Sequence, residues 1–389
     1  MNNTTNQKIV AGKRLDSLDF FRGATVAAMI WVNNPGSWSH IYGPFAHAEW
    51  HGWTPTDLIF PFFLFIVGVS IVLAFTKAMA KGLSKRELLN KTFIRAFKIF
   101  GLGIALTAFP YVVFSPEFAL HPKIYDLRIP GVLQRIAVVY ALAAWAFLYL
   151  EKRKLWILST VLLVGYWLAI MLIPVPGYGA GAIDSPVGNL AAYIDQWALS
   201  GHMWKDQWDP EGILSTFPAL VTSLLGIHVG FLVIKEDLSA ESKVLELFKW
   251  GFFWLVLGYL WSWSFPLNKN IWTSSFTLFT GGLATIALAF SYWFIDVKEK
   301  KKGINWGIAY GTNAITVFFL SGILGRIMGM IQLPWGDQVL SLKGILYGKI
   351  LIGLFDNPMI ASVSHSILWV LLFWGLARWM QKKSIIIKV

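Results

Sequence analysis

The stretch LIFPFFLFIVGVSIVLAF, residues Leu58–Phe75, contains no charged side chain and decides the fold. It has about the length of apolar helix that crosses the hydrocarbon core of a bilayer. Further apolar runs follow along the chain, which is 56% hydrophobic and only 14% charged. Soluble domains carry roughly 25% charged residues, so the composition predicts an all-α, polytopic integral membrane protein.

About ten transmembrane helices are predicted from these runs, in one transmembrane domain over residues 1–389. Every second link is rich in lysine and arginine, beginning with Lys8, Lys13 and Arg14 before the first run. Basic links face the cytoplasm, so both termini are predicted to be cytoplasmic. This topology accounts for the net charge of +12 without a nucleic-acid partner. The predicted spans are residues 16–34, 57–79, 90–113, 130–149, 154–173, 211–234, 245–265, 272–294, 304–329 and 360–381.

A polar stretch, HAEWHGWTPTD, follows the first predicted span and occupies residues His47–Asp57 on the outer side. Apolar spans do not need histidines and carboxylates at their boundary, so the stretch is the first candidate site. His47 is a candidate general base or nucleophile, because imidazole titrates near neutral pH. Glu49 and Asp57 are nearby carboxylates that could fix its tautomer. Asp57 could equally be an N-terminal helix charge.

Metal binding is a competing interpretation of the same stretch. His47 and His51 are four residues apart and would share a face if residues 46–53 were helical. That spacing suits zinc, but no third ligand is evident and the order is not His-Glu-x-x-His. The chain also contains no cysteine. We therefore predict no metal, and a structural histidine at the interface remains an alternative for either residue.

Ionisable and amide side chains within or beside the spans are further candidates, because such groups are costly in a bilayer. Asp19 and Arg22 are three residues apart and can pair on one helix face. Arg135 either snorkels to the outer interface or binds an anion. Asp209 and Glu211 open the sixth span, as substrate-binding carboxylates or as helix N-terminal charges. Three amides join the set, with turn formation or helix packing as the alternative: Asn33, Asn268 and Asn313.

Six segments resemble, in order, the heparan-alpha-glucosaminide N-acetyltransferase family in its bacterial branch. They recur from the first to about the ninth span, and six matches in order are far more specific than one. The segments are RLDSLDFFRG (14–23), HAEWHGW (47–53) continued by DLIFPF (57–62), RIPGVLQR (128–135), LIPVPG (172–177), DPEGIL (209–214) and NKNIWT (268–273).

The resemblance implies transfer of an acetyl group from cytoplasmic acetyl-CoA, a co-substrate, to the amino group of a glucosamine residue across the membrane. The active-site histidine of the family corresponds to His47, as base or transient acetyl carrier. Asp57 would orient it, and a family asparagine corresponds to Asn33, which could steady the thioester oxygen. His51 stands where the compared family member has asparagine.

The phosphates of acetyl-CoA are expected at the basic cytoplasmic face, with the acceptor on the outer side. Candidate coenzyme contacts are Arg22, Arg95, Arg135 and Asn313, and candidate acceptor contacts are Glu49, His51, Asp209, Glu211 and Asn268. The acceptor would be an amino sugar or an oligosaccharide end. The resemblance further suggests a homodimer in membrane lipid and, because the large lumenal domain of the animal enzyme is absent, a bacterial inner membrane. The alternative is a secondary transporter of a sugar or amino sugar, although no repeated halves are detected.

Overall fold

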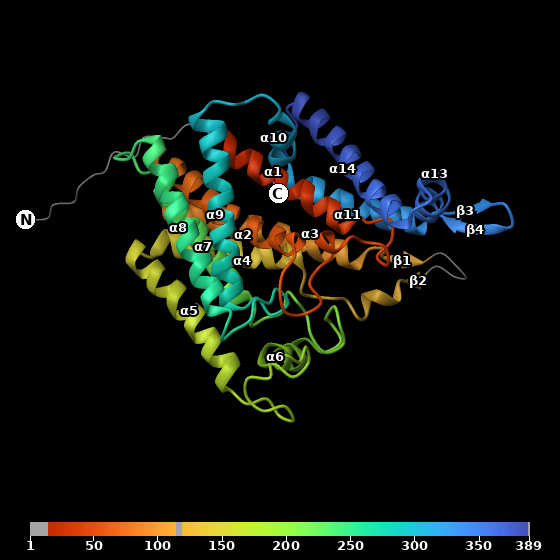
Figure 1. The fold of residues 1–389 in the computed structure, drawn as a ribbon, viewed down its shortest axis with the longest axis horizontal. Coiled ribbons are helices and arrows are strands. Elements are labelled where there is room, and N and C mark those ends of the chain that lie inside the picture. Colours follow the sequence, from red (N-terminus) through yellow and green to blue (C-terminus); the bar gives the residue numbers. More distant parts are fainter. Residues whose placement is uncertain (1–14, 114–118, 388–389) are drawn as a thin grey trace, which may run out of the picture.

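The computed structural model describes residues 15–113 and 119–387, and this part is mostly helical with two short antiparallel hairpins (Figure 1). Lys8, Lys13 and Arg14 lie outside the described residues. The hairpins pair β1 (Val112–Val113) with β2 (Ala119–Leu120) and β3 (Gln332–Trp335) with β4 (Gln338–Ser341). The helices are α1 Asp16–Asn33, η1 Gly43–Phe45, α2 Pro55–Ala80, α3 Lys85–Ala108, η2 Pro122–Ile124, α4 Val132–Tyr149, α5 Lys152–Leu172, α6 Leu190–Leu199, α7 Thr216–Val233, α8 Ala240–Trp261, α9 Ser274–Ser291, η3 Tyr292–Val297, α10 Asn305–Thr312, α11 Ala314–Met330, α12 Leu342–Gly344, η4 Ile345–Leu351, α13 Ile352–Phe355 and α14 Pro358–Lys382.

Each predicted span falls on a helix or on a pair of consecutive helices. Among the described residues, seven helices are long and apolar enough to cross a membrane, and the pair α10–α11 would be an eighth. Helices α1 and α3 are long enough, but at least three charged residues remain in any 18-residue stretch of either one. The polytopic helical fold is therefore confirmed with seven or eight candidate spans. The count of ten and the cytoplasmic termini stay predictions.

Asn313 breaks the predicted span 304–329, because α10 and α11 meet at this residue with a bend of 82°. Asn313 therefore lies inside the candidate span that the pair α10–α11 forms, at the break between the two helices. Its Nδ2 donates to the Ile385 carbonyl (2.9 Å), and its Oδ1 accepts from the Ile387 N–H (2.9 Å). The backbone of the C-terminal tail thus packs against the break and forms hydrogen bonds with the side-chain amide of Asn313.

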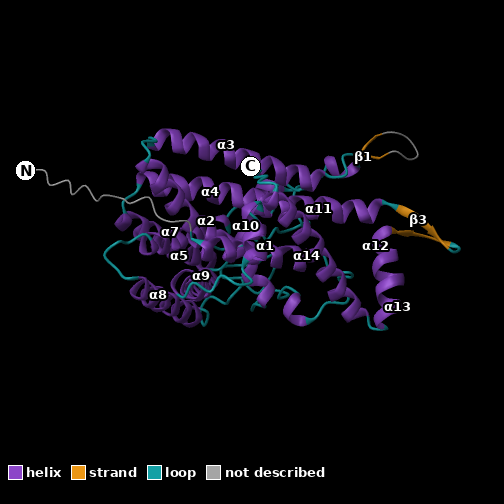
Figure 2. Ribbon diagram, turned by 90° about the horizontal axis from the view of Figure 1, so that it is seen from above, coloured by secondary structure: helices purple, strands orange, loops and turns teal. Residues whose placement is uncertain are grey.

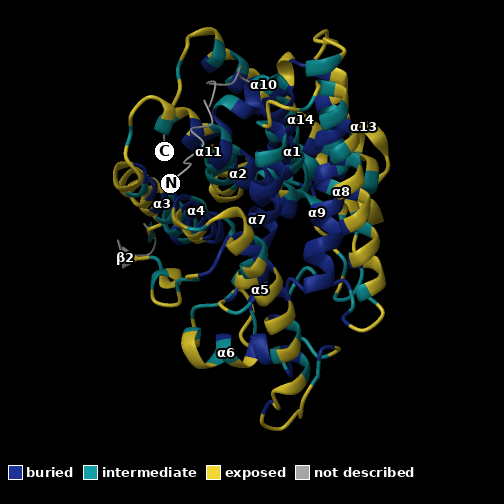
Figure 3. Ribbon diagram, turned by 90° about the vertical axis from the view of Figure 1, so that its left-hand side faces the viewer, coloured by how far each residue is buried: buried dark blue, intermediate teal, exposed yellow. Residues whose placement is uncertain are grey.

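Helices α2 and α7 form the buried centre of the bundle (Figure 3). Two glycines permit their close approach. A Cβ atom added at Gly68 would lie 1.9 Å from the Ser223 carbonyl oxygen, and one at Gly226 would lie 2.1 Å from that of Phe65. Small residues at such crossings let two helix backbones touch, which favours helix association in a membrane.

Substitution of Gly226 by alanine should lower the midpoint of thermal unfolding in detergent by several degrees. The added methyl group must push α2 and α7 apart, and overpacking of this kind costs about 1–3 kcal/mol. Gly375→Ala is the matched control, because nothing lies within 4 Å of a Cβ atom at that position in α14. Equal unfolding midpoints for the two variants would contradict the close contact.

Three links converge at one end of the bundle. The link 173–215, with α6, forms a layer over that end (Figure 1). Trp50 Nε1 donates to the Ile183 carbonyl of this layer (2.8 Å), and Gly52 N–H donates to the Leu267 carbonyl (2.8 Å). The loop before α2 is therefore fixed against both the layer and the link from α8 to α9.

The segment Leu342–Phe355 stands at the side of the bundle with the β3–β4 hairpin (Figure 2). The sequence predicts a short re-entrant or interfacial helix over residues 344–355, and the structure confirms that the segment is helical through α12, η4 and α13. Its position in the membrane stays a prediction.

Candidate functional site

His47 and Asp57 form a pair where the loop before α2 meets the first turn of that helix. His47 Nδ1 lies 2.7 Å from Asp57 Oδ1. A carboxylate only accepts hydrogen bonds, so this contact places the proton on Nδ1 and leaves the Nε2 lone pair free. Of the two carboxylates considered from the sequence, Asp57 makes this contact, whereas Glu49 is exposed.

The local sequence that starts α2 also holds the Asp57 carboxylate. Thr54 is the N-cap residue, Pro55 takes the first helical position, and Asp57 completes a capping box. Asp57 Oδ2 accepts from the N–H groups of Ala48 and Thr54, each at 3.0 Å. The Asp57 side chain is 1% exposed and that of His47 is 47% exposed. A buried, fixed carboxylate therefore presents a half-exposed imidazole.

Lys269 completes the cluster from the link between α8 and α9. Its Nζ lies 3.0 Å from His47 Nδ1, 3.4 Å from His47 Nε2 and 3.5 Å from Asp57 Oδ1. Burial lowers the pKa of Lys269, against the opposing attraction of Asp57 and Glu211. Sequence reasoning assigned it no role, because it is 222 residues from His47. The only feature of the sequence that could have pointed to Lys269 is its place in the segment NKNIWT, one of the six segments that resemble the family.

His51 belongs to a neighbouring polar contact. Residues 46–53 are irregular rather than helical, so His47 and His51 do not share a helix face. His51 Nε2 lies 2.9 Å from Asp184 Oδ1, and its Nδ1 lies 3.2 Å from Asn268 Nδ2. Within residues 15–113 and 119–387, no group of three or more histidine or acidic side chains is placed to hold a metal ion.

Asp209 and Glu211 are already engaged by an arginine. Arg128 contacts Asp209 through Nε (2.7 Å) and Nη2 (2.6 Å), and its Nη2 also pairs with Glu211. Burial opposes the charge of Arg128, but the two carboxylates outweigh it and raise its pKa. This ion-pair cluster holds the start of α4 against the segment before α7. A role for Asp209 and Glu211 in acceptor binding stays a proposal.

Arg135 is buried in α4 beneath that cluster rather than snorkelling to the interface. Its Nη2 donates to the Gly212 carbonyl (2.9 Å) and to Ser215 Oγ (2.5 Å). Its guanidinium carbon lies 5.3 Å from the centre of the Trp272 ring. Its Nε and Nη1 have no hydrogen-bond partner in the part of the chain that the structure describes.

Asn33 lies at the exposed end of α1, where its Nδ2 donates to the Met29 carbonyl of the same helix (2.9 Å). Over the described ranges, no hydrogen bond joins it to His47 or Asp57. The structure therefore does not bring Asn33 into direct contact with the pair.

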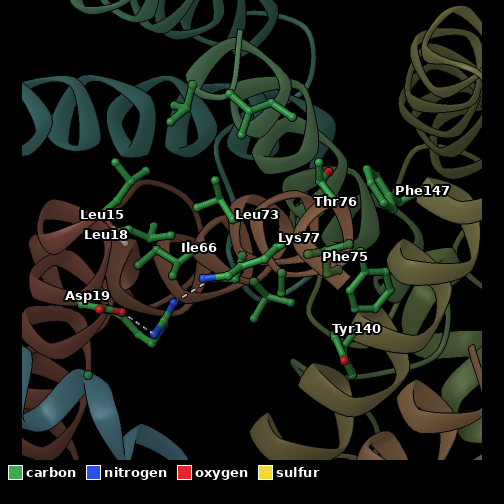
Figure 4. A pocket seen from close by; sticks show the side chains of 18 of the residues that line it. Leu15, Leu18, Asp19, Ile66, Leu73, Phe75, Thr76, Lys77, Tyr140 and Phe147 are labelled. Carbon is green, nitrogen blue, oxygen red and sulfur yellow. Dashed lines mark hydrogen bonds and ion pairs between the residues drawn. The ribbon is translucent and has the colours of Figure 1, made fainter. Parts of the chain in front are cut away.

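A cavity of about 1280 Å³ occupies the bundle beside α1, α2, α4 and α7. Figure 4 shows Leu18 and Ile66 on one side of it and Tyr140 and Phe147 on the other. Arg22, Arg95 and Asn313, three of the four predicted coenzyme contacts, line it, whereas Arg135 does not. The predicted pair is present, since Arg22 Nη1 lies 3.0 Å from Asp19 Oδ1. The other basic lining residues are Lys77, Lys152, Lys235 and Lys243.

The cavity runs along α2 away from the His47–Asp57 pair. Its lining on this helix extends from Phe63 to Met79. At 1.5 Å per residue, Phe63 is about 9 Å and Lys77 about 30 Å from Asp57 along the helix axis. A bilayer core is about 30 Å thick, so the cavity and the pair together extend along one membrane-spanning helix.

Comparisons with known proteins place the chain in one family. The family model described as "Heparan-alpha-glucosaminide N-acetyltransferase, catalytic" matches residues 14–260. The chain is 31% identical over 362 residues to the heparan-alpha-glucosaminide N-acetyltransferase of Homo sapiens, covering 78% of this chain and 52% of that protein. It is 29% identical over 364 residues to that of Mus musculus, covering 79% and 53%. The chain thus spans about half the length of these curated relatives.

Proposed function

This chain belongs to the heparan-alpha-glucosaminide N-acetyltransferase family, and on that premise we propose that it is a membrane acetyltransferase. The proposed reaction moves the acetyl group of acetyl-CoA to the amino group of glucosamine or a related amino sugar. One observation carries the proposal: the His47–Asp57 pair lies at one end of α2, and a large cavity with basic lining residues extends along the rest of that helix.

His47 Nε2 is the proposed reacting atom. In direct transfer, Nε2 takes a proton from the amine while the amine nitrogen bonds to the acetyl carbon and the carbon–sulfur bond breaks. In the two-step route, Nε2 itself bonds to the acetyl carbon, the coenzyme thiolate leaves, and the amine then displaces the imidazole. We favour direct transfer, because one base suffices. In both routes Asp57 fixes the tautomer and stabilises the charged ring.

Asn33 keeps its proposed role as a donor to the thioester oxygen, where negative charge develops. Its Nδ2 donates one N–H to the Met29 carbonyl (2.9 Å), and the second N–H of the same amide can donate to the thioester oxygen.

The cavity is the proposed site of acetyl-CoA. Its lysines and arginines match the negative phosphates, and its apolar walls suit the pantetheine arm. In the proposed topology these basic residues are cytoplasmic, so acetyl-CoA enters from the cytoplasm and its acetyl end points toward His47. Arg22, Arg95 and Asn313 are the proposed contacts. Arg135, which is buried in α4 and does not line the cavity, is proposed to face the acetyl end.

Replacement of Arg95 by glutamine should weaken acetyl-CoA binding by about tenfold or more, because a hydrogen bond to a charged group contributes about 1.5–3 kcal/mol. The turnover at saturating acetyl-CoA should change little, since Arg95 lines the cavity from α3 and is not one of the groups that contact His47 or Asp57. Calorimetric titration of the purified protein with acetyl-CoA measures the affinity. Arg86→Gln is the control, on the exposed first turn of the same helix. Equal affinities for both variants would count against the assigned site.

The acceptor is proposed to bind on the layer side of the pair, where His51, Asn268 and Glu49 surround His47 in the loop and links. Hydroxyl-rich sugars suit such a mixture of amide, imidazole and carboxylate groups. Asp209 and Glu211 would contribute through the charge of their cluster with Arg128. We propose the inner membrane of a bacterium as the location, with a homodimer as the assembly.

Secondary transport is the second candidate, because the broken span at Asn313 is a feature that transporters use for substrate binding. The two functions differ in the ligand that stabilises the protein. Acetyl-CoA should raise the thermal midpoint in detergent if the chain is a transferase. Stabilisation by an amino sugar alone, with none from acetyl-CoA, would favour transport.

A further inference from the structure

We propose that Lys269 is a positioning residue that keeps His47 uncharged for acetyl transfer. The inference rests on the proposed function and deepens it, since it adds a third group to the His47–Asp57 pair. It is carried by the contacts of one ammonium group, which lies within 3.5 Å of both members of the pair.

The ammonium group lies against the imidazole ring and not in line with its free lone pair. Its Nζ is within 3.4 Å of both ring nitrogens. Nδ1 is closer to Lys269 but has its proton directed at Asp57 Oδ1 (2.7 Å), so it offers Lys269 no lone pair. The contact is therefore one of charge: a cation beside the ring opposes the uptake of a second proton.

Asp57 alone would have the opposite effect. A buried carboxylate 2.7 Å from an imidazole favours the protonated, charged ring, which is neither a base nor a nucleophile. Lys269 offsets that charge from 3.5 Å. The other charged or titratable groups near the centre are Glu49 in the same loop, His51 with Asp184, and Glu211 and Arg135, which act on Lys269 over longer distances.

The same geometry requires Lys269 to stay protonated. A neutral amine 3.4 Å from Nε2 resembles the amine of the acceptor, and in the two-step route it would capture the acetyl group held on His47. Burial lowers the pKa of Lys269, and the ion pair with Asp57 opposes this shift by favouring the ammonium form. Two members of the trio thus act on the charge of another: Asp57 favours the protonated form of Lys269, and Lys269 favours the neutral form of His47.

The test is the pH dependence of kcat/KM for acetyl transfer. Removal of the positive charge in Lys269→Met should move the acid limb of the profile to higher pH by about one unit or more, with much of the activity recovered at alkaline pH. Lys269→Arg keeps the charge and should keep the limb in place. Lys205→Met is the matched control, because Lys205 is exposed in the outer layer and lies over Trp204. An unmoved limb in Lys269→Met, or a shift to lower pH, overturns the inference.

A second measurement uses the wild-type protein and does not depend on the folding of a variant. Diethyl pyrocarbonate modifies neutral imidazole, and mass spectrometry locates the adduct. The reagent should modify His47 at neutral pH, and complete protection of His47 at neutral pH would overturn the inference. Incubation with acetyl-CoA should leave Lys269 unacetylated, and an acetyl group on Lys269 would equally overturn it. If the wild-type protein transfers no acetyl group from acetyl-CoA to glucosamine, the proposed function itself fails. If only the pH tests fail, the role of Lys269 alone is wrong.

Discussion

Replacement of His47 by alanine should lower kcat for acetyl transfer to glucosamine by about 10²–10⁴-fold, the usual contribution of a positioned base. The imidazole is the titratable group fixed by Asp57 beside the cavity, and alanine offers neither a proton acceptor nor a nucleophile. Binding of acetyl-CoA should persist, because His47 does not line the cavity and Lys77, its basic residue on α2, is about 30 Å from Asp57 along the helix. Transfer of labelled acetyl groups by the purified protein gives the rate, and ligand-dependent thermal stability gives the binding.

The matched comparison is His51→Asn, at the histidine four residues further along. His51 contacts Asp184 and Asn268 rather than Asp57, so its replacement should act mainly on KM for the acceptor. A His47→Ala variant that transfers acetyl at the wild-type rate would remove His47 from the reaction. Equal losses of kcat in the two variants would show that His47 has no catalytic role that His51 does not share.

Asp57→Asn should reduce kcat by at least about 10²-fold while the helix start survives. The asparagine oxygen can still accept from the N–H groups of Ala48 and Thr54, which cap α2. Its NH₂ group would then face His47 Nδ1 and draw the ring into the tautomer with the proton on Nε2. The same exchange in a serine protease triad lowers kcat by about 10⁴-fold for this reason.

Asp184→Asn is the control for this prediction, because Asp184 contacts His51 as Asp57 contacts His47 but is exposed. It should leave kcat within a few fold of the wild-type value. Circular dichroism and thermal unfolding would verify that both variants are folded. If Asp57→Asn is folded and has wild-type kcat, tautomer control by Asp57 is excluded.

The elements of this fold that depend on local sequence could be predicted from it. Long apolar runs give the spans their helices, and the spacing of Asp19 and Arg22 gives their ion pair, since both are set within one turn of helix. The break at Asn313 could not be predicted in this way. It depends on the C-terminal tail, whose backbone binds the Asn313 side chain from more than 70 residues away.

The candidate site was predictable only where its parts are close in sequence. His47 and Asp57 are ten residues apart, so the sequence alone could propose Asp57 as the partner, with Glu49 as a second nearby carboxylate. Lys269 comes from the other half of the chain, in a short link for which turn formation was a sufficient explanation. Asp209 and Glu211 were expected to be available for substrate, but Arg128 pairs with both. These roles depend on ion pairs between residues that are far apart in the sequence, and such pairs cannot be predicted from the spacing of residues along the chain.

The central claim is that an acetyl group passes along α2 from one side of the membrane to an amine on the other. Proteoliposomes that hold the protein in one orientation, with labelled acetyl-CoA on the side of Lys77 and Lys235 and glucosamine on the side of His47, test it most directly. We expect labelled N-acetylglucosamine only in the compartment that holds glucosamine, and no detectable labelled product with His47→Ala. Product that forms only when acetyl-CoA and glucosamine share one compartment would contradict it.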